Sequence, residues 1–313
     1  AALQHRIWNE RIAQTPLQPP IFILGFWRSG TTLLHELLFL DPRFATPTTY
    51  ECFAPEHFLL SERAISKLRF LLPRQRPMDN MPAGWERPQE DEFALCAMGA
   101  ISPYESIAFP HHSTEHYPYL NLDVSPAQRE HWQSSLLYFM RAVTLQRGLQ
   151  NDGQSTPRLV LKSPTHTARL RVLATLFPDA QFIHLTREPA ALFSSNRRLR
   201  RSLHQSQSLQ TYDCSEFDEH IFKSLEIIYN DWGHCAASLP PHRLIEVRYE
   251  DMVRDPLCAL ARIYDQLQLG HYEQVKPHFA NYFHQLTAAE HATVYERWTD
   301  YANRYGYNDN PEA

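Results

Sequence analysis

The chain has 313 residues, of which 43% are apolar, and a formal net charge of -5 at pH 7. This length is enough for one large domain with a hydrophobic core. The negative charge argues against a nucleic-acid-binding face, and no run of residues approaches the ~20 consecutive apolar residues of a membrane-spanning helix. The composition therefore predicts a globular protein with no nucleic-acid partner and no transmembrane segment in this chain.

Five widely spaced cysteines bear on where the protein works. An odd number of cysteines without a regular spacing is typical of a reducing compartment, so we expect a cytoplasmic protein. The chain starts at Ala1 rather than at a methionine, and whether an anchor or targeting segment precedes it stays open. Residues 1–20 are predicted to form a short helix and a proline-rich lead-in.

A short apolar strand leads into a glycine-rich loop near the N-terminus. Residues 21–24 (IFIL) precede the run GFWRSGTT, in which Gly25 and Gly30 have the spacing of a nucleoside-triphosphatase phosphate loop. That loop normally has a lysine after its second glycine. This chain has Thr31 there and a cation, Arg28, earlier in the loop. The pattern therefore predicts a phosphate site that does not serve ATP.

Leucines recur at helical spacing after the loop, which predicts a helix from Thr31 or Thr32 to about residues 41–42. The first N–H groups of a helix have no partner within the helix, and the helix dipole places positive charge at that end. An oxyanion bound there is stabilised. The second glycine of the loop allows close approach, and the side chains of Arg28 and Ser29 add hydrogen-bond donors.

Two strands joined by a helix are predicted in residues 158–187. The first strand ends in Lys162, and the second is followed by Arg187. This order predicts a parallel pair whose carboxyl ends lie at the same edge of a sheet. Open α/β sheets bind ligands at that edge, so both cations are expected beside the phosphate loop. Ser195 lies eight positions after Arg187, on the next predicted helix.

The C-terminal third continues the α/β pattern. Helical periodicity over residues 217–232 precedes a strand at 244–248, and another helix follows at about 256–267. The strand would place Tyr249 at the same edge of the sheet as the phosphate loop. The tail, about residues 271–313, is predicted to pack on the core or to mediate association.

Taken together, these motifs make the chain resemble the sulfotransferases that use 3′-phosphoadenosine-5′-phosphosulfate (PAPS). In that family a K/R-S-G-T-T loop binds the 5′-phosphosulfate, and here it matches Arg28, Ser29, Gly30, Thr31 and Thr32. An arginine followed eight residues later by a serine binds the 3′-phosphate in the family, and this pair matches Arg187 and Ser195. The match spans roughly residues 20–270 and resembles the bacterial-type and tyrosylprotein branches.

The resemblance implies an α/β fold of the P-loop-like type, with three layers (α/β/α), a central parallel sheet and a mainly helical, loop-rich insertion that binds the acceptor. It implies a single sulfotransferase domain over residues 1–313, with the insertion at about 45–157. It also implies PAPS as donor, 3′,5′-phosphoadenosine (PAP) as product and no metal ion. Tyr249 would contact the nucleotide, and Lys162 would assist catalysis, like the corresponding lysine of the tyrosylprotein branch.

Sulfuryl transfer requires cations at the leaving group and a base for the acceptor hydroxyl. Arg28, Lys162 and the helix start at Thr31 fit the first role. For the base the first choice is Glu51, because the tyrosylprotein branch places its catalytic glutamate just after the phosphate-loop helix. Three other groups remain as alternatives: Glu90, Asp91 and His57.

The acceptor is not identified by the sequence. A phenol, an alcohol, a sugar, a lipid or a peptide tyrosine each fits the chemistry, and the apolar, aromatic insertion favours a small or lipidic hydroxyl. Five aromatic residues of the insertion are candidates for lining an acceptor pocket: Trp85, Tyr104, Phe109, Tyr117 and Tyr119. Whether the chain forms a homodimer stays open.

Two further features have alternative interpretations. Some arginines of the basic run at residues 196–201 (NRRLRR) would flank the nucleotide 3′-phosphate. The others would form a solvated helix face. A non-catalytic sensor of PAPS, PAP or a glycan would need the same two phosphate sites as an enzyme. A P-loop kinase is disfavoured because Thr31 occupies the position of its lysine.

Overall fold

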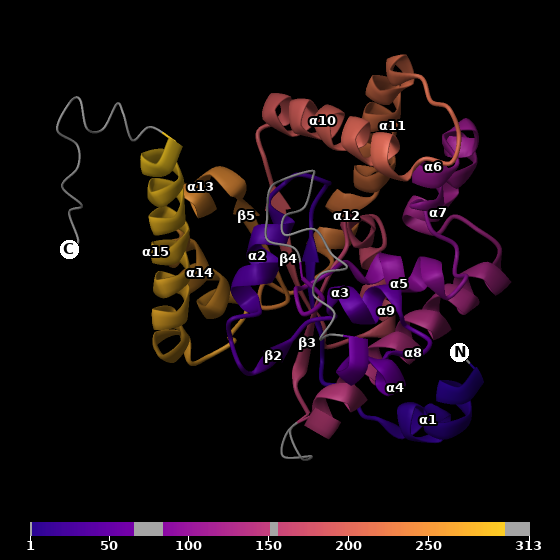
Figure 1. Cartoon of the computed structure of the whole chain (residues 1–313), viewed down its shortest axis with the longest axis horizontal. Helices are drawn as coiled ribbons and strands as arrows, with labels where there is room; N and C mark the ends of the chain where they lie inside the picture. Colours follow the sequence, from indigo (N-terminus) through magenta and orange to yellow (C-terminus); the bar gives the residue numbers. More distant parts are fainter. Residues whose placement is uncertain (1, 66–83, 151–155, 298–313) are drawn as a thin grey trace. The chain divides into compact units, whose positions relative to one another are not determined.

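A five-stranded parallel sheet forms the centre of the protein (Figure 1). The computed structural model describes residues 2–65, 84–150 and 156–297. The strands lie in the order β2-β3-β1-β4-β5, and each neighbouring pair is parallel. Their bounds are Ile21–Leu24 for β1, Phe44–Ala45 for β2, Arg158–Lys162 for β3, Gln181–Thr186 for β4 and Leu244–Arg248 for β5.

The strand β1 is central, between β3 on one side and β4 on the other. Ile23 of β1 is in register with Lys162 of β3, and Leu24 is in register with His184 of β4. The carboxyl ends of the strands therefore meet at one edge of the sheet, where open α/β sheets bind ligands. This register brings the loop after β1, Lys162 and the residues that follow β4 to the same edge.

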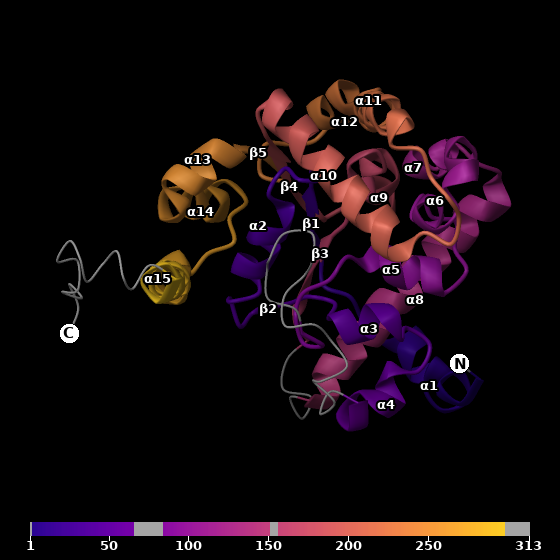
Figure 2. The same ribbon diagram turned by 45° about the horizontal axis from the view of Figure 1, so that its top comes forward.

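Helices cover both faces of the sheet in Figure 1 and Figure 2. On one side, α2 (Thr31–Leu38) contacts β1 and β3, and α14 (Pro256–Gln266) contacts β5. On the other side lie α8 (Pro126–Gln150) and α9 (Leu170–Leu176). This arrangement confirms the predicted three-layer α/β/α fold with a central parallel sheet.

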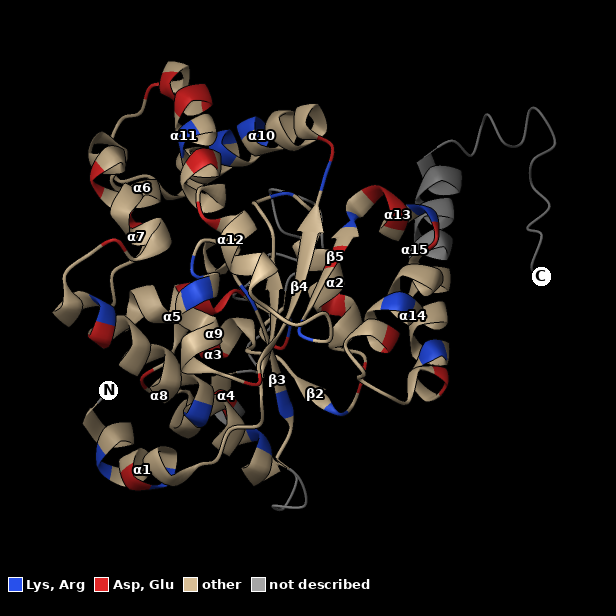
Figure 3. Ribbon diagram, turned by 180° about the vertical axis from the view of Figure 1, so that it is seen from behind, with Lys and Arg blue, Asp and Glu red and all other residues tan. Residues whose placement is uncertain are grey.

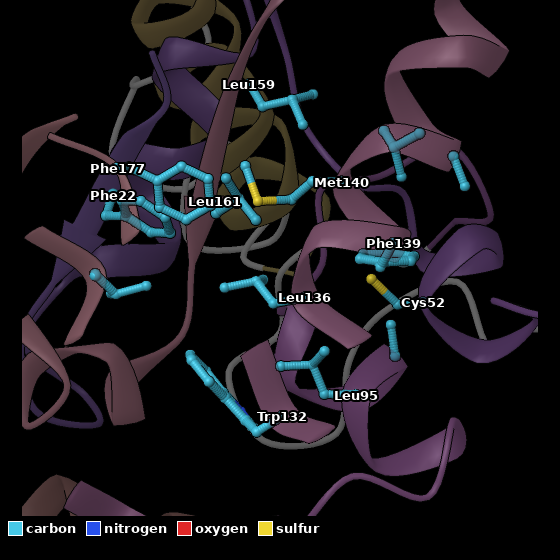
Figure 4. Packing of buried hydrophobic residues seen from close by; sticks show 14 of the residues in the cluster. Phe22, Cys52, Leu95, Trp132, Leu136, Phe139, Met140, Leu159, Leu161 and Phe177 are labelled. Carbon is cyan, nitrogen blue, oxygen red and sulfur yellow. The ribbon is translucent and has the colours of Figure 1, made fainter. Parts of the chain in front are cut away.

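The main hydrophobic cluster packs one face of the sheet against α8 (Figure 4). Phe22 and Leu24 of β1 lie in this cluster with Trp132, Phe139 and Met140 of α8, and all five side chains are buried. A parallel sheet is covered on both faces, which explains why the sequence of β1 (IFIL) is apolar throughout. The cluster thereby fixes the position of the loop that follows β1.

The predicted insertion, about residues 45–157, is mainly helical, as expected. Its helices in chain order are α3 (Thr49–Phe53), α4 (Phe58–Ile65), α5 (Asp91–Ala97), α6 (Glu105–Ala108), the 3-10 helix η2 (Pro110–His116), α7 (Tyr117–Asn121) and α8. The helix α8 is the longest of them, with 25 residues. It contacts α5 and α1 (Ala2–Gln14), so it connects the insertion to the rest of the chain.

The remaining helices follow β3. They are η3 (Pro164–Thr167), α9, α10 (Pro189–Gln207), η4 (Cys214–Glu216), α11 (Phe217–Tyr229), α12 (Trp232–Ala237), α13 (Tyr249–Arg254), α14 and α15 (Tyr272–Arg297). The chain divides into two compact units, Ala1–Leu269 and Gly270–Ala313, and α15 belongs to the second. The packing of residues 271–313 on the core stays a prediction. Among the described residues, none of the helices combines the length and hydropathy needed to cross a bilayer.

One helix was not expected from the sequence. Between β5 and α14 the chain forms α13, which ends at Arg254. Asp255 then leaves the helical region, with φ of -145° and ψ of 82°, because the following Pro256 disfavours a helical residue before it. The Asp255 carboxylate accepts a hydrogen bond from the N–H of Cys258 at 3.0 Å and so caps α14. Asp255 and Pro256 thus end α13 and begin α14.

Candidate active site

The loop after β1 begins at a position that only glycine can occupy. Gly25 has φ of 143°, and a Cβ added there would lie 2.5 Å from Ser29 Oγ and 2.7 Å from the carbonyl oxygen of Leu185. Its N–H donates to Thr167 Oγ1 at 2.8 Å. The loop is therefore packed against β4 and held by η3. Sequence reasoning missed Thr167, which lies outside every recognisable motif.

Gly30, at the end of the loop, is covered by the ring of Tyr249. Gly30 has φ of 98°, and a Cβ added there would lie 2.3 Å from Tyr249 Cδ2. The guanidinium carbon of Arg187 lies 4.4 Å from the centre of the same ring, which is the distance of a cation–π contact. The structure thus brings together three predicted site residues that follow three different strands.

Arg28 joins the two predicted phosphate-binding motifs directly. Its Nε donates to Ser195 Oγ at 3.0 Å, and its carbonyl oxygen accepts from Nη1 of Arg187 at 2.8 Å. Arg28 has φ of 71°, a left-handed conformation that costs a non-glycine residue about 1–3 kcal/mol. Such strain persists only where surrounding contacts hold it. Here those contacts come from the arginine and serine of the second motif.

The start of α2 presents unused hydrogen-bond donors. Thr31 is the first residue of α2, and no side chain caps this end of the helix. The N–H groups of the first turn therefore lack partners within the helix. Ser29 Oγ is also buried without a hydrogen-bond partner, which is unusual for a buried polar atom. These donors fit an oxyanion such as a phosphate or phosphosulfate group.

Lys162 lies at the carboxyl end of β3, beside the phosphate loop. Its Nζ donates to Glu90 Oε1 at 2.5 Å and lies 3.5 Å from Thr32 Oγ1. The side chain of Lys162 is only 2% exposed, whereas that of Glu90 is 13% exposed. An ion pair at the edge of the sheet therefore adjoins the start of α2.

Three consecutive acidic residues at the start of α5 pair with the segment that follows β3. Each pairs with a different residue of that segment: Glu90 with Lys162, Asp91 with His166 and Glu92 with Arg169. The Asp91 and Glu92 pairs are fully buried, and both side chains of each pair are 0% exposed. These two pairs hold α5 against the segment that follows β3, whereas the side chain of Glu90 is partly exposed.

Asp91, one of the alternative bases, is enclosed by its partners. Its Oδ2 lies 2.6 Å from His166 Nε2, and its Oδ1 accepts from Ser163 Oγ at 3.0 Å. Burial is the largest single influence and opposes the charge on Asp91, but the attraction of His166 and the hydrogen bonds from His166, Ser163 and the backbone together hold the pKa of Asp91 below its usual value. A carboxylate that is 0% exposed is poorly placed to contact an acceptor.

Glu90 has a different environment from its two neighbours. It occupies the N-cap position of α5, but its side chain makes no capping hydrogen bond. Instead the carboxylate bonds to Lys162 and to the hydroxyl of Tyr104. The same hydroxyl accepts a hydrogen bond from Nε1 of Trp27, a residue of the phosphate loop, at 3.4 Å. Burial and the charge of Glu90 raise the pKa of Tyr104, which keeps the phenol protonated.

Glu51, the first choice for the base, is held in a structural network. Its side chain is 0% exposed, and Oε1 and Oε2 accept from Nη1 and Nη2 of Arg147 at 2.7 Å and 2.8 Å. It also forms a capping box with Thr48 at the start of α3. His57, the remaining alternative, is exposed and bonds to Ser61 through Nδ1. The geometry therefore favours Glu90 among the four base candidates.

A pocket adjoins the Glu90 end of this site. Trp27 and Tyr104 contribute to its wall, together with Asn196 of α10, whose Nδ2 donates to the carbonyl oxygen of Trp27 at 2.7 Å. Of the five aromatic candidates for an acceptor pocket, Tyr104 and Tyr117 line it, and the other three do not. Sequence reasoning missed the role of Asn196, which was grouped with the basic run. Within the described part of the chain, no cluster of three metal-ligating side chains occurs.

Comparisons with known proteins identify the family of this chain. The model of the sulfotransferase family matches residues 19–274. Two curated relatives, from Mycobacterium bovis and Mycobacterium tuberculosis, are both named omega-hydroxy-beta-dihydromenaquinone-9 sulfotransferase Stf3. Each is 38% identical to this chain over 317 residues, which cover 97% of this chain and 80% of the relative.

Solved structures support the fold. Sulfotransferase STF1 from Mycobacterium tuberculosis aligns with a TM-score of 0.62 and 21% identity over 89% of this chain and 81% of its own. Sulfotransferase STF9 from Mycobacterium avium aligns with a TM-score of 0.65 and 20% identity over 91% of this chain and 72% of its own. Since the family model covers most of the sequence and the curated relatives align over nearly all of it, this chain belongs to the sulfotransferase family and is an enzyme that transfers a sulfuryl group.

Proposed function

We propose that the protein transfers the sulfuryl group from PAPS to the hydroxyl of an acceptor and releases PAP. The observation that carries this proposal is the direct contact between the two phosphate-binding motifs, through Arg28, Ser195 and Arg187. PAPS has a phosphate on the 3′ side of its ribose and a phosphosulfate on the 5′ side, so it needs two adjacent anion sites. The unpartnered hydroxyl of Ser29 supports an anion at the loop.

Each half of the donor has its own set of residues in this proposal. The 5′-phosphosulfate would be held by the loop and the first turn of α2, that is by Arg28, Ser29, Gly30, Thr31 and Thr32. Arg187 and Ser195 would hold the 3′-phosphate. Tyr249 would contact the nucleotide, because its ring already packs on Gly30 and under the Arg187 guanidinium. The N–H groups of the loop add donors that need no charge.

For catalysis we assign Arg28 and Lys162 to the leaving group and Glu90 to the base. Transfer forms a bond from the acceptor oxygen to sulfur and breaks the bond from sulfur to the oxygen that bridges to phosphorus. The acceptor proton passes to the carboxylate of Glu90, and the two cations stabilise the charge that develops on the bridging oxygen. Glu90 is preferred to Glu51 because its side chain is 13% exposed and its partner Tyr104 lines the pocket, whereas the side chain of Glu51 is 0% exposed against Arg147.

We propose a small or lipidic alcohol or phenol as the acceptor. The curated relatives are named for a hydroxylated menaquinone, which is a lipidic molecule with an alcohol group. The pocket beside Glu90 supports this class, since aromatic and aliphatic side chains such as Trp27, Tyr117 and Leu199 line it. A cytoplasmic location is part of the proposal, and it rests on five cysteines that are all unpaired.

Transfer of radioactive sulfur tests the proposed function. Protein incubated with [35S]PAPS and a panel of phenols, alkyl alcohols, sugars and lipidic alcohols is expected to label a lipidic or small hydroxyl compound. Nucleotide binding is measured beside it, and PAP is expected to bind while ATP with Mg²⁺ does not. Tight binding of PAP without transfer to any member of the panel would favour the non-catalytic sensor. Tight binding of ATP would favour a kinase.

Replacing Arg187 with alanine tests the 3′-phosphate site. The Arg187→Ala variant is expected to bind PAPS about 10- to 100-fold more weakly, because a charge-assisted contact contributes about 1.5–3 kcal/mol. Adenosine-5′-phosphosulfate, which has no 3′-phosphate, should lose much less affinity. Arg248→Ala is the matched control, since Arg248 ends the neighbouring strand and its side chain is 68% exposed. Equal losses for both nucleotides would contradict the assignment.

A further inference from the structure

The pocket beside Glu90 lies among helices from two distant parts of the sequence. One wall comes from the insertion, through α6, η2 and α7, and the other comes from α10 and α11. These helices gather at one end of the first unit in Figure 1 and Figure 2, and contacts join α10 to α6 and α7 to α11. The pocket therefore extends from the proposed transfer point, marked by Trp27 and Tyr104, toward the middle of α10.

One face of α10 serves both the nucleotide site and this pocket. Ser195 contacts Arg28, and the next residues on that face, Asn196, Leu199 and Arg200, line the pocket. Arg200 belongs to the basic run whose role the sequence left open. Figure 3 shows basic residues along α10 beside acidic residues on α11, and Arg197 forms an ion pair with Asp218 of α11. Arg200 instead turns into the pocket.

The guanidinium of Arg200 has no anionic partner in the described part of the chain. Its Nε is buried and lacks a hydrogen-bond partner. No aspartate or glutamate is among the described residues that line the pocket. Arg169 shows the contrast, because its buried guanidinium is paired with Glu92 through two hydrogen bonds. An arginine left unpaired in a partly enclosed site loses solvation without compensation.

The groups around Arg200 do not supply the missing negative charge. Burial lowers the pKa of Arg200 to about 10, so its guanidinium stays protonated at neutral pH. Burial, with Arg200 as the next cause, lowers the pKa of His220 to about 2 and that of His204 to about 4, so both imidazoles are neutral. Burial raises the pKa of Tyr117, whose phenol donates or accepts as a neutral group. The pocket thus has a net positive charge.

We propose that Arg200 binds an oxyanion on the acceptor, so that the preferred acceptor is an apolar alcohol or phenol with a second, acidic group. This inference rests on the proposed function, since it takes the pocket to be the acceptor site. The hydroxyl to be sulfated lies at the Glu90 and Tyr104 end, and the carboxylate or phosphate lies against Arg200. The guanidinium then sets which alcohols enter the pocket in a productive orientation.

Titration calorimetry on the PAP-bound protein tests the inference without requiring turnover. The ligands are ω-hydroxy carboxylates of increasing chain length, each compared with its primary amide, which has nearly the same shape and no charge. At neutral pH the best carboxylate is expected to bind about 10- to 100-fold more tightly than its amide. The corresponding ω-hydroxyalkyl phosphates are measured as a second series. Comparing their affinities with those of the carboxylates shows which of the two anions the pocket prefers.

Variants of α10 assign the preference to Arg200. Arg200→Met should reduce the carboxylate-to-amide ratio to near one, and Arg200→Lys should retain part of it because the charge remains without the planar fork. Arg201→Met is the matched control, since Arg201 is exposed on the same helix and does not line the pocket. Unchanged affinity for PAP shows that each variant is folded, and Arg200→Gln replaces Arg200→Met if the latter fails to fold.

Two results would overturn the inference. One is a series in which no acid or phosphate binds the unaltered protein more tightly than its neutral counterpart. The other is a preference for the acid that survives in Arg200→Met or Arg200→Gln. A lack of sulfuryl transfer from PAPS would instead contradict the proposed function, because the calorimetric comparison does not depend on transfer. The two proposals therefore fail in different experiments.

Discussion

Replacing Lys162 with alanine is expected to lower the turnover number by about 10²- to 10³-fold, the usual effect of removing one donor that stabilises transition-state charge. The ammonium lies at the end of β3, 2.5 Å from Glu90 and 3.5 Å from the hydroxyl of Thr32. Its side chain is 2% exposed, so little water is available to replace its charge. The loss should fall mainly on the turnover number, because Arg187 and the loop still bind the nucleotide.

The control for this prediction has to separate catalysis from the broken ion pair. Lys162→Ala leaves Glu90 without its cationic partner, so Lys162→Arg, which keeps a cation beside Glu90, is measured beside it. Lys223→Ala is the surface control, because Lys223 is half-exposed and pairs with Glu226 on the same helix. PAP affinity and thermal unfolding are measured for each variant. A turnover number of Lys162→Ala equal to that of the unaltered protein would remove Lys162 from the mechanism.

Much of the fold could be predicted because the sequence patterns that indicate its elements are local. The apolar run of β1, the helical spacing of α2 and the strand-helix-strand order of residues 158–187 each lie within one continuous segment. Elements that depend on distant partners were missed. The strand β2 has only two residues, Phe44 and Ala45, and exists because it pairs with β3. Two residues cannot show a periodic pattern, so no reading of the sequence alone would have placed them.

The candidate site likewise contains residues that local motifs predict and residues whose role depends on distant partners. Arg28, Arg187 and Ser195 were found because they belong to motifs at the carboxyl ends of strands, and the sheet register then brings them together. The base was harder to predict, because the choice depends on pairs that are far apart in the sequence. Glu51 meets an arginine 96 positions away, and Glu90 meets a lysine 72 positions away. Both carboxylates follow the phosphate loop in the sequence, and they differ in their partners and in their exposure to solvent.

Replacing Glu90 with glutamine is expected to lower the turnover number by about 10²- to 10⁴-fold, the range for loss of a general base. The amide keeps the size of the side chain and can still bond to Tyr104, but it cannot accept the proton of the acceptor. Affinity for PAP should change little, since Glu90 is proposed to contact the acceptor and not the nucleotide. The same change at Glu51 has a different expected effect, because that carboxylate is fully buried against Arg147.

Glu51→Gln is therefore the matched control for the assignment of the base. Leaving the buried guanidinium of Arg147 without a counter-charge should lower the free energy of unfolding by about 3–5 kcal/mol. Below the unfolding temperature of this variant, its turnover number should stay near that of the unaltered protein. Thermal unfolding and [35S]PAPS turnover, measured on both variants, separate the two roles. If Glu51→Gln is stable but inactive while Glu90→Gln turns over normally, the base is Glu51 and the ion pair between Glu90 and Lys162 serves only to hold α5 against the sheet.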